Sequence, residues 1–120
     1  MSRAPPLVCP LEEDWRGTLD AVALAHGWPS SGDVARLAAH VRALSEAYND
    51  ASRASAAVKD AGAARLGFSF ARDVPKGAAA VRELVATGAL RARPGLSVLD
   101  VGAGLGATTW GVVRALEAAG

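Results

Sequence analysis

Four residues near the C-terminal end of the sequence have the types and the spacing to hold a ligand. Asp100 is followed by Gly102, Gly104 and Gly106 within the stretch LSVLDVGAGLGATTW, residues 96–110. Glycines accept positive φ angles and let a ligand approach the backbone closely. A helix that begins directly after them would turn its first N–H groups and the positive end of its dipole toward the same ligand. The stretch therefore predicts a binding turn for a nucleotide or for an adenosyl cofactor.

The spacing of the glycines leaves both kinds of ligand open. Gly102-x-Gly104-x-x-Ala107 also fits the dinucleotide fingerprint with alanine in the last place, whereas the ATP-type phosphate loop is excluded because no Gly-Lys-Ser/Thr follows. Asp100 distinguishes the two ligands, because a carboxylate beside the turn repels a pyrophosphate, and most strongly at a low dielectric. S-adenosylmethionine carries an ammonium and a sulfonium group instead. Asp100 therefore favours this cofactor over a dinucleotide.

The elements that would position this turn are those of an α/β protein. Residues 96–101 form an apolar run that is too short for a helix and is typical of a buried parallel strand. A helix is expected from about Ala107, with an apolar face toward the sheet. Strand, glycine turn and helix together make the first unit of a doubly wound, Rossmann-like domain.

The residues before this unit are expected to be mainly helical. Apolar spacings of three and four predict helices over 11–25 and about 31–49, and the alanine-rich residues 51–66 favour a third. Residues 66–70, LGFSF, fit a short strand as well as they fit the buried end of a helix or a loop anchor. Pro75 suits the first turn of a further helix that ends near Gly88. The ARPG stretch then separates a helical N-terminal region, 1–93, from the start of the Rossmann-like domain, 94–120.

Three stretches of the sequence resemble one family of proteins. They are ALSEAYNDASR (43–53), FARDVPKGAAAVREL (70–84) and VLDVGAGLGATTW (98–110). LDVGAGLG looks like the first motif of class I S-adenosylmethionine-dependent methyltransferases. The order and spacing of all three resemble the methyltransferase-like assembly factors of the small ribosomal subunit, a family with mitochondrial members and bacterial relatives. The Arg-x-x-Pro element at Arg72 and Pro75 is the most distinctive part. Leu105, where the family commonly has proline, is a mild departure.

This resemblance implies a helical region before a class I methyltransferase fold, S-adenosylmethionine as the cofactor, and the small ribosomal subunit or its rRNA as the partner, in ribosome assembly and translation. By position, Asp100, Gly102, Gly104 and Gly106 would line the cofactor, with Asp100 near its methionine amine. No residue is assigned a catalytic role, and no metal ligands are expected.

The sequence contains only one clear strand before it ends at Gly120. A class I domain needs several parallel strands and an acidic residue after the second one for the ribose hydroxyls. We therefore expect the chain to be an incomplete, N-terminal part of such a protein. It would need a missing C-terminal half or an additional chain to complete its sheet, and it should transfer no methyl group on its own.

Two other functions stay open at this point. One is a fragment of an NAD(P)-binding oxidoreductase. The other is a helical module whose residues 11–90 bind a protein or rRNA, since residues 51–93 hold eight basic and three acidic side chains. Solvated helix faces are the more usual explanation of such a charge run.

The composition, 51% hydrophobic and 21% charged, is that of a soluble globular chain. No apolar run is long enough to cross a membrane, and the N-terminus lacks the apolar core of a secretory signal. Together with a single cysteine, these features predict a cytoplasmic protein without membrane contact.

Overall fold

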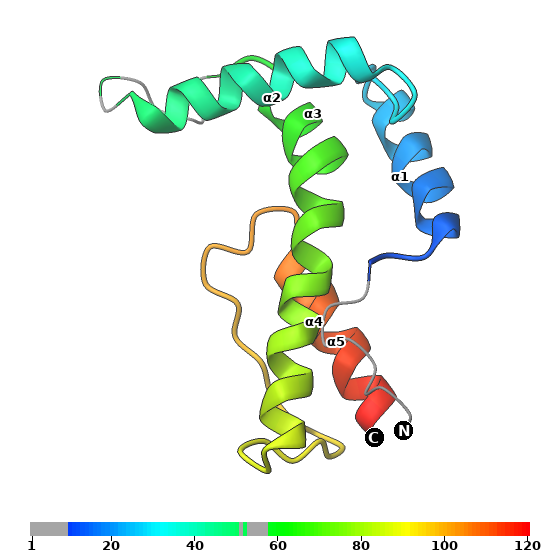
Figure 1. Cartoon of the computed structure of the whole chain (residues 1–120), viewed down its shortest axis with the longest axis vertical. Helices are drawn as coiled ribbons and strands as arrows, with labels where there is room; N and C mark the ends of the chain where they lie inside the picture. Colours follow the sequence, from blue (N-terminus) through cyan, green and yellow to red (C-terminus); the bar gives the residue numbers. More distant parts are fainter. Residues whose placement is uncertain (1–9, 51, 53–57) are drawn as a thin grey trace, which may run out of the picture. The chain divides into compact units, whose positions relative to one another are not determined.

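All regular elements of the described chain are helical (Figure 1). The structure is a computed structural model, and it describes residues 10–50, 52 and 58–120. The helices are α1 (Glu13–Ala25), α2 (Val34–Asn49), α3 (Ala61–Ala64), the π-helix η2 (Arg65–Phe70), α4 (Ala71–Ala86) and α5 (Ala107–Ala119). They belong to two compact units, Glu12–Phe70 and a second one that contains Ala71–Gly120.

The first unit is built from α1, α2, α3 and η2. Its core contains Leu44, Ala61 and Ala64, against which Val41 and Val58 pack. The turn between α1 and α2 is fixed by Asp20, whose two carboxylate oxygens accept hydrogen bonds from the N–H and the hydroxyl of Ser31, both at 2.7 Å. Asp33 then caps α2 by accepting from the N–H of Arg36. These caps agree with the predicted helices over 11–25 and 31–49.

The second unit is built on the pair α4 and α5. Ala78, Val81 and Ala115 form its buried cluster, with Val85 and Leu90 among the side chains packed around them. Two glycines let the helices approach closely. A Cβ atom at Gly111 would overlap the carbonyl oxygen of Val74, and one at Gly77 would lie 3.0 Å from the carbonyl oxygen of Thr108. The α4–α5 contact is therefore made partly by backbone against backbone.

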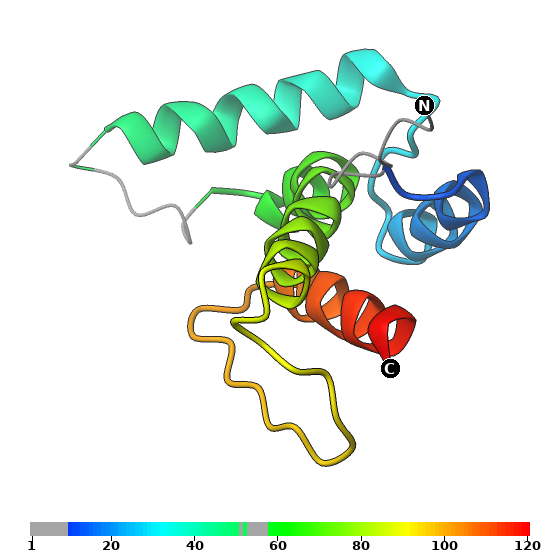
Figure 2. The same ribbon diagram turned by 60° about the horizontal axis from the view of Figure 1, so that its bottom comes forward.

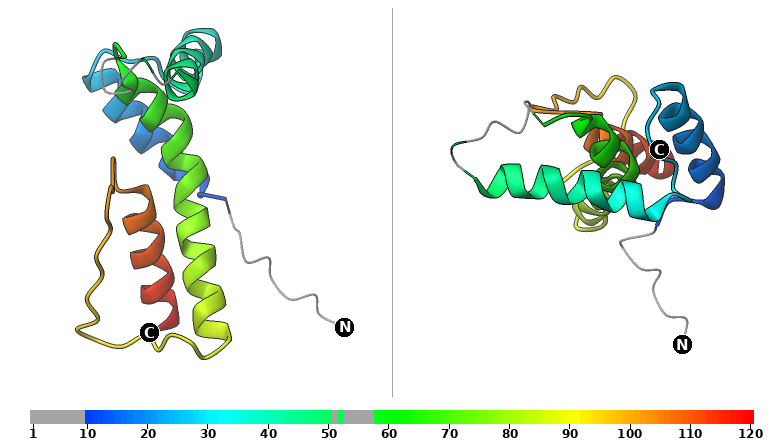
Figure 3. Two further views of the ribbon diagram at one scale, coloured as in Figure 1. Left: turned by 90° about the vertical axis from the view of Figure 1, so that its left-hand side faces the viewer. Right: turned by 90° about the horizontal axis from the view of Figure 1, so that it is seen from above.

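The predicted α/β fold class is wrong for this structure. The described residues contain no β-strand, and the stretch 96–101 lies in the irregular connection between α4 and α5. Figures 2 and 3 show this connection leaving α4 and returning to the start of α5. A strand exists only when a neighbouring strand pairs with its backbone N–H and C=O groups. The described chain offers no such neighbour, so no Rossmann-like strand–turn–helix unit forms.

Three smaller predictions can be compared with the helices. The helix expected from Ala107 begins at that residue, and the one expected to end near Gly88 ends at Ala86, with Gly88 at a φ of 77°. The stretch 66–70 lies in η2 and α4 continues from it, so Pro75 sits inside a helical run instead of opening one. For the alanine-rich stretch 51–66, residues 51 and 53–57 lie outside the described residues, and helix α3 begins at Ala61.

Candidate functional site

The glycine turn before α5 has the backbone conformation that its sequence predicts. Gly102, Gly104 and Gly106 have φ angles of 70°, 57° and 82°, all in the left-handed region that favours glycine. A Cβ atom at Gly102 or Gly104 would meet no atom within 4 Å. The requirement for glycine at these two positions is therefore conformational, and the surface of the turn is open to solvent.

The turn leads directly into the N-terminus of α5. Gly106 is the residue before the helix, and its carbonyl oxygen accepts the first helical hydrogen bond, from the N–H of Trp110 at 2.9 Å. No side chain caps α5, because the capping position is occupied by glycine. The N–H groups of the first turn and the positive end of the helix dipole are thus available to a negatively charged or polar ligand group.

Asp100 lies beside this first turn of α5. The hydroxyl of Thr109 donates a hydrogen bond to Oδ2 of Asp100 at 2.7 Å, across nine residues of sequence. The contact is partly buried, and it holds a negative charge near the positive end of a helix, which is a favourable arrangement. The structure therefore brings Asp100 and the three glycines together around one helix end. Thr109 is a member of this site that sequence reasoning did not identify.

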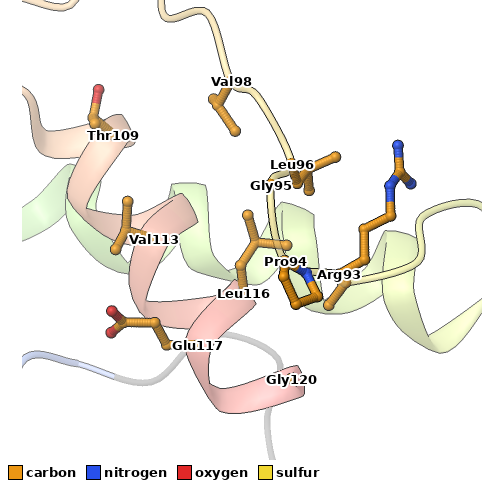
Figure 4. Close-up of a pocket in the computed structure, with 11 residues that line it drawn as sticks. Arg93, Pro94, Gly95, Leu96, Val98, Thr109, Val113, Leu116, Glu117 and Gly120 are labelled. Atoms are coloured by element: carbon orange, nitrogen blue, oxygen red, sulfur yellow. The ribbon is translucent and has the colours of Figure 1, made fainter.

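A hollow of about 550 Å³ lies next to the turn, between residues 92–98 and α5 (Figure 4). Its lining is mainly apolar and includes Leu96, Val98, Val113 and Leu116. Figure 4 shows the side chains of Val98 and Thr109 on opposite sides of its upper end. Sequence reasoning missed this hollow. The sequence shows only that 96–101 and α5 are apolar, which does not reveal a hollow between them.

Two basic residues of the 51–93 stretch, Arg72 and Lys76, form ion pairs within α4. Nε of Arg72 lies 2.8 Å from Oδ1 of Asp73, and Nζ of Lys76 lies 3.3 Å from the same oxygen. The hydrogen bond from Arg72 lowers the pKa of Asp73, and the bond to Asp73 raises the pKa of Arg72. Arg72 and Lys76 therefore share an acid on α4. Arg53 lies outside the described residues.

The histidines show no sign of a metal site. Nδ1 of His26 lies 2.9 Å from the carbonyl oxygen of Val22, and the imidazole stacks on Trp28 with a centroid distance of 4.5 Å. Within the described ranges, no group of three or more His, Cys, Asp and Glu residues is arranged to hold a metal ion.

None of the described helices combines the length and the apolar character needed to cross a membrane.

Comparison of the chain with protein-family models, with curated proteins and with solved structures gives no match.

Proposed function

We propose that the turn formed by residues 100–109 binds S-adenosylmethionine, and that the chain is a methyltransferase-like protein that acts on or with the small ribosomal subunit. One observation carries the cofactor part of the proposal. The carboxylate of Asp100 is held by Thr109, at 2.7 Å, beside the uncapped N-terminus of α5. A negative group and a positive helix end thus lie next to each other.

This pair of charges suits the amino-acid end of the cofactor. The methionine part of S-adenosylmethionine carries an ammonium and a carboxylate on one carbon atom. Oδ2 of Asp100 is engaged by Thr109, and Oδ1 accepts no hydrogen bond from a described residue, which leaves it for the ammonium. The N–H groups of the first turn of α5 suit the carboxylate. A pyrophosphate would gain from the helix end but would be repelled by Asp100.

The chain's own residues would bind and orient the cofactor, and the bound cofactor would supply the methyl group. The open backbone at Gly102 and Gly104 allows the adenosyl part to approach without a steric barrier. The ribosomal partner and the cytoplasmic compartment are proposed from the sequence resemblance and from composition.

Isothermal titration calorimetry on the purified chain tests the cofactor. We expect heat on addition of S-adenosylmethionine and a weaker signal with NADPH. Asp100→Asn should weaken cofactor binding more than tenfold, because a hydrogen bond to a charged group contributes about 1.5–3 kcal/mol. Asp14→Asn, which changes an acid in the first turn of α1, is the matched control and should leave binding unchanged.

Two results would reject the cofactor assignment. One is NADPH binding as tight as, or tighter than, that of S-adenosylmethionine, which would indicate a dinucleotide turn. The other is binding that Asp100→Asn leaves intact in a chain whose helical circular dichroism is unchanged. The ribosomal partner is tested separately, by salt-dependent binding of a small-subunit rRNA fragment, since phosphate contacts weaken steeply as salt rises.

A further inference from the structure

The connection between α4 and α5 carries a second surface, which precedes the glycine turn along the chain and meets it at Asp100. Part of the connection's backbone is unpaired. The N–H of Leu90 bonds to the carbonyl of Leu84, and the carbonyl of Ala103 accepts from Gly106, each as part of a turn. Between Leu90 and Ala103 the chain makes two turns, at 94–95 and at 101–102, and the backbone groups of residues 97–99 between them bond to no other described residue. Such a row of free N–H and C=O groups is what a strand-like peptide segment pairs with.

The side chains of this stretch divide between two directions. Leu96 and Val98 line the hollow beside α5, and Asp100 is bonded to Thr109 of α5. The alternate residues Leu99 and Val101 are 88% and 85% exposed. Leu96 and Asp100 are half-buried against their own unit, Val98 is 53% exposed, and the exposure of Leu99 and Val101 leaves one side of the stretch bare. Leu99 and Val101 are therefore positioned to contact something outside the unit.

Two arginines at the beginning of the same connection define the charge of a partner. Arg91 and Arg93 are exposed, and neither forms an ion pair with a described residue. Figure 4 shows the guanidinium of Arg93 directed away from the hollow. The turn at Pro94 and Gly95 separates these charges from the apolar end at 96–101. The surface is thus basic at one end and apolar at the other.

We propose that residues 91–101 form a docking edge for an extended peptide segment of a partner protein, apolar at one end and acidic at the other. The apolar end pairs with the backbone of 96–101 and covers Leu99 and Val101. The acidic end contacts Arg91 and Arg93, which fixes the direction of the peptide by charge complementarity. A nucleic acid fits less well, because phosphates gain nothing from Leu99 and Val101 and are repelled by Asp100.

The first test is a titration of the ¹⁵N-labelled chain with a synthetic decapeptide, followed by NMR. The peptide carries two glutamates at one end and alternating valine and threonine over the rest. We expect the amide signals of residues 96–101 to shift. A peptide N-methylated at alternate residues, which lacks the pairing N–H groups, should bind at least tenfold more weakly. So should a peptide with lysine in place of glutamate.

Variants of the chain locate the contact. Leu99→Ser and the double change Arg91→Glu with Arg93→Glu should each weaken peptide binding about tenfold or more. Leu99 is exposed, so its substitution should leave the helical circular dichroism of the chain unchanged. Leu24→Ser, at a 67% exposed leucine of α1, and Arg42→Glu, at an exposed arginine of α2, are the matched controls and should have no effect.

Three outcomes would overturn the proposal. The first is the absence of amide shifts in 96–101 at millimolar peptide. The second is equal binding of the N-methylated peptide, which would show that no backbone pairing occurs. The third is an rRNA fragment that outcompetes the peptide and binds the Leu99→Ser variant normally, which would make this surface a nucleic-acid contact. None of these measurements uses S-adenosylmethionine, so their result is independent of the proposed cofactor.

Discussion

Replacement of Gly111 by alanine tests the packing of α4 against α5. The added Cβ atom would overlap the carbonyl oxygen of Val74 and lie 2.8 Å from the backbone nitrogen of Ala78. Both atoms belong to the backbone of α4, so no side-chain rotation can relieve the overlap. Overpacking of this kind lowers the free energy of unfolding by about 1–3 kcal/mol. We expect a value near the upper end, because the backbone of α4 must move. Alanine regains about 1 kcal/mol of helix propensity, which leaves a net loss of about 2 kcal/mol.

Urea unfolding measures this loss, followed by far-ultraviolet circular dichroism and by tryptophan fluorescence, to which Trp15, Trp28 and Trp110 all contribute. At a slope of about 2 kcal/mol per molar urea, the midpoint should fall by about 1 M. Gly17→Ala is the matched control, since Gly17 lies inside α1 and a Cβ there meets nothing within 4 Å. That change should raise the free energy of unfolding by about 0.5–1 kcal/mol. If Gly111→Ala also raises the free energy of unfolding, the close approach of α4 and α5 is contradicted.

Other substitutions test single contacts. Ser31 lowers the pKa of Asp20, so the stabilisation by this carboxylate is full above its unfolded pKa of about 3.9 and is lost as the pH falls through the lower folded value. In urea titrations between pH 6 and pH 2, the free energy of unfolding of the wild type should therefore fall by up to about 1 kcal/mol more than that of Asp20→Asn. Equal decreases in the two proteins would contradict the contact. Gly106→Ala should lower stability by about 1–2 kcal/mol, because its φ of 82° strains any other residue, and an unchanged melting temperature would argue against this turn. Thr109→Val should cost about 1 kcal/mol by removing the hydrogen bond to Asp100, and Thr109→Ser should retain it.

The helices were predictable because local signals and tertiary packing agree for them. The apolar spacing of residues 11–25 and 31–49 corresponds to α1 and α2. The start of α5 at Ala107 follows from the glycine at the preceding position, whose positive φ ends the turn. The conformations of Gly102, Gly104 and Gly106 were also predictable, since these positions serve a tight turn.

The absence of a strand at 96–101 could not be predicted from these residues alone, because a strand is not a local structure. The apolar pattern of 96–101 reports what these side chains prefer to contact, and it does not report whether a partner strand exists. For residues 66–70 the sequence left a strand and a helix end open, and the structure has the π-helix η2. Its sequence, RLGFSF, has an alternation of apolar residues that fits a strand, while its place between α3 and α4 favours helical continuation. The helices on either side, α3 and α4, therefore favour the helical conformation of this stretch.

The same connection accounts for both functional proposals, and Asp100 links them. Its hydrogen bond to Thr109 sets which way the even-numbered residues face, and therefore leaves Leu99 and Val101 directed outward. The same bond holds the carboxylate at the N-terminus of α5, where the cofactor is proposed to bind. A rotation of this stretch by one residue would turn Asp100 away from α5 and bring Leu99 toward the hollow. Loss of the Asp100–Thr109 bond should therefore weaken cofactor and peptide together, whereas Leu99→Ser should weaken the peptide alone. Joint weakening would show that both sites depend on one backbone arrangement. Weakening of only one ligand would show that the two surfaces are unrelated.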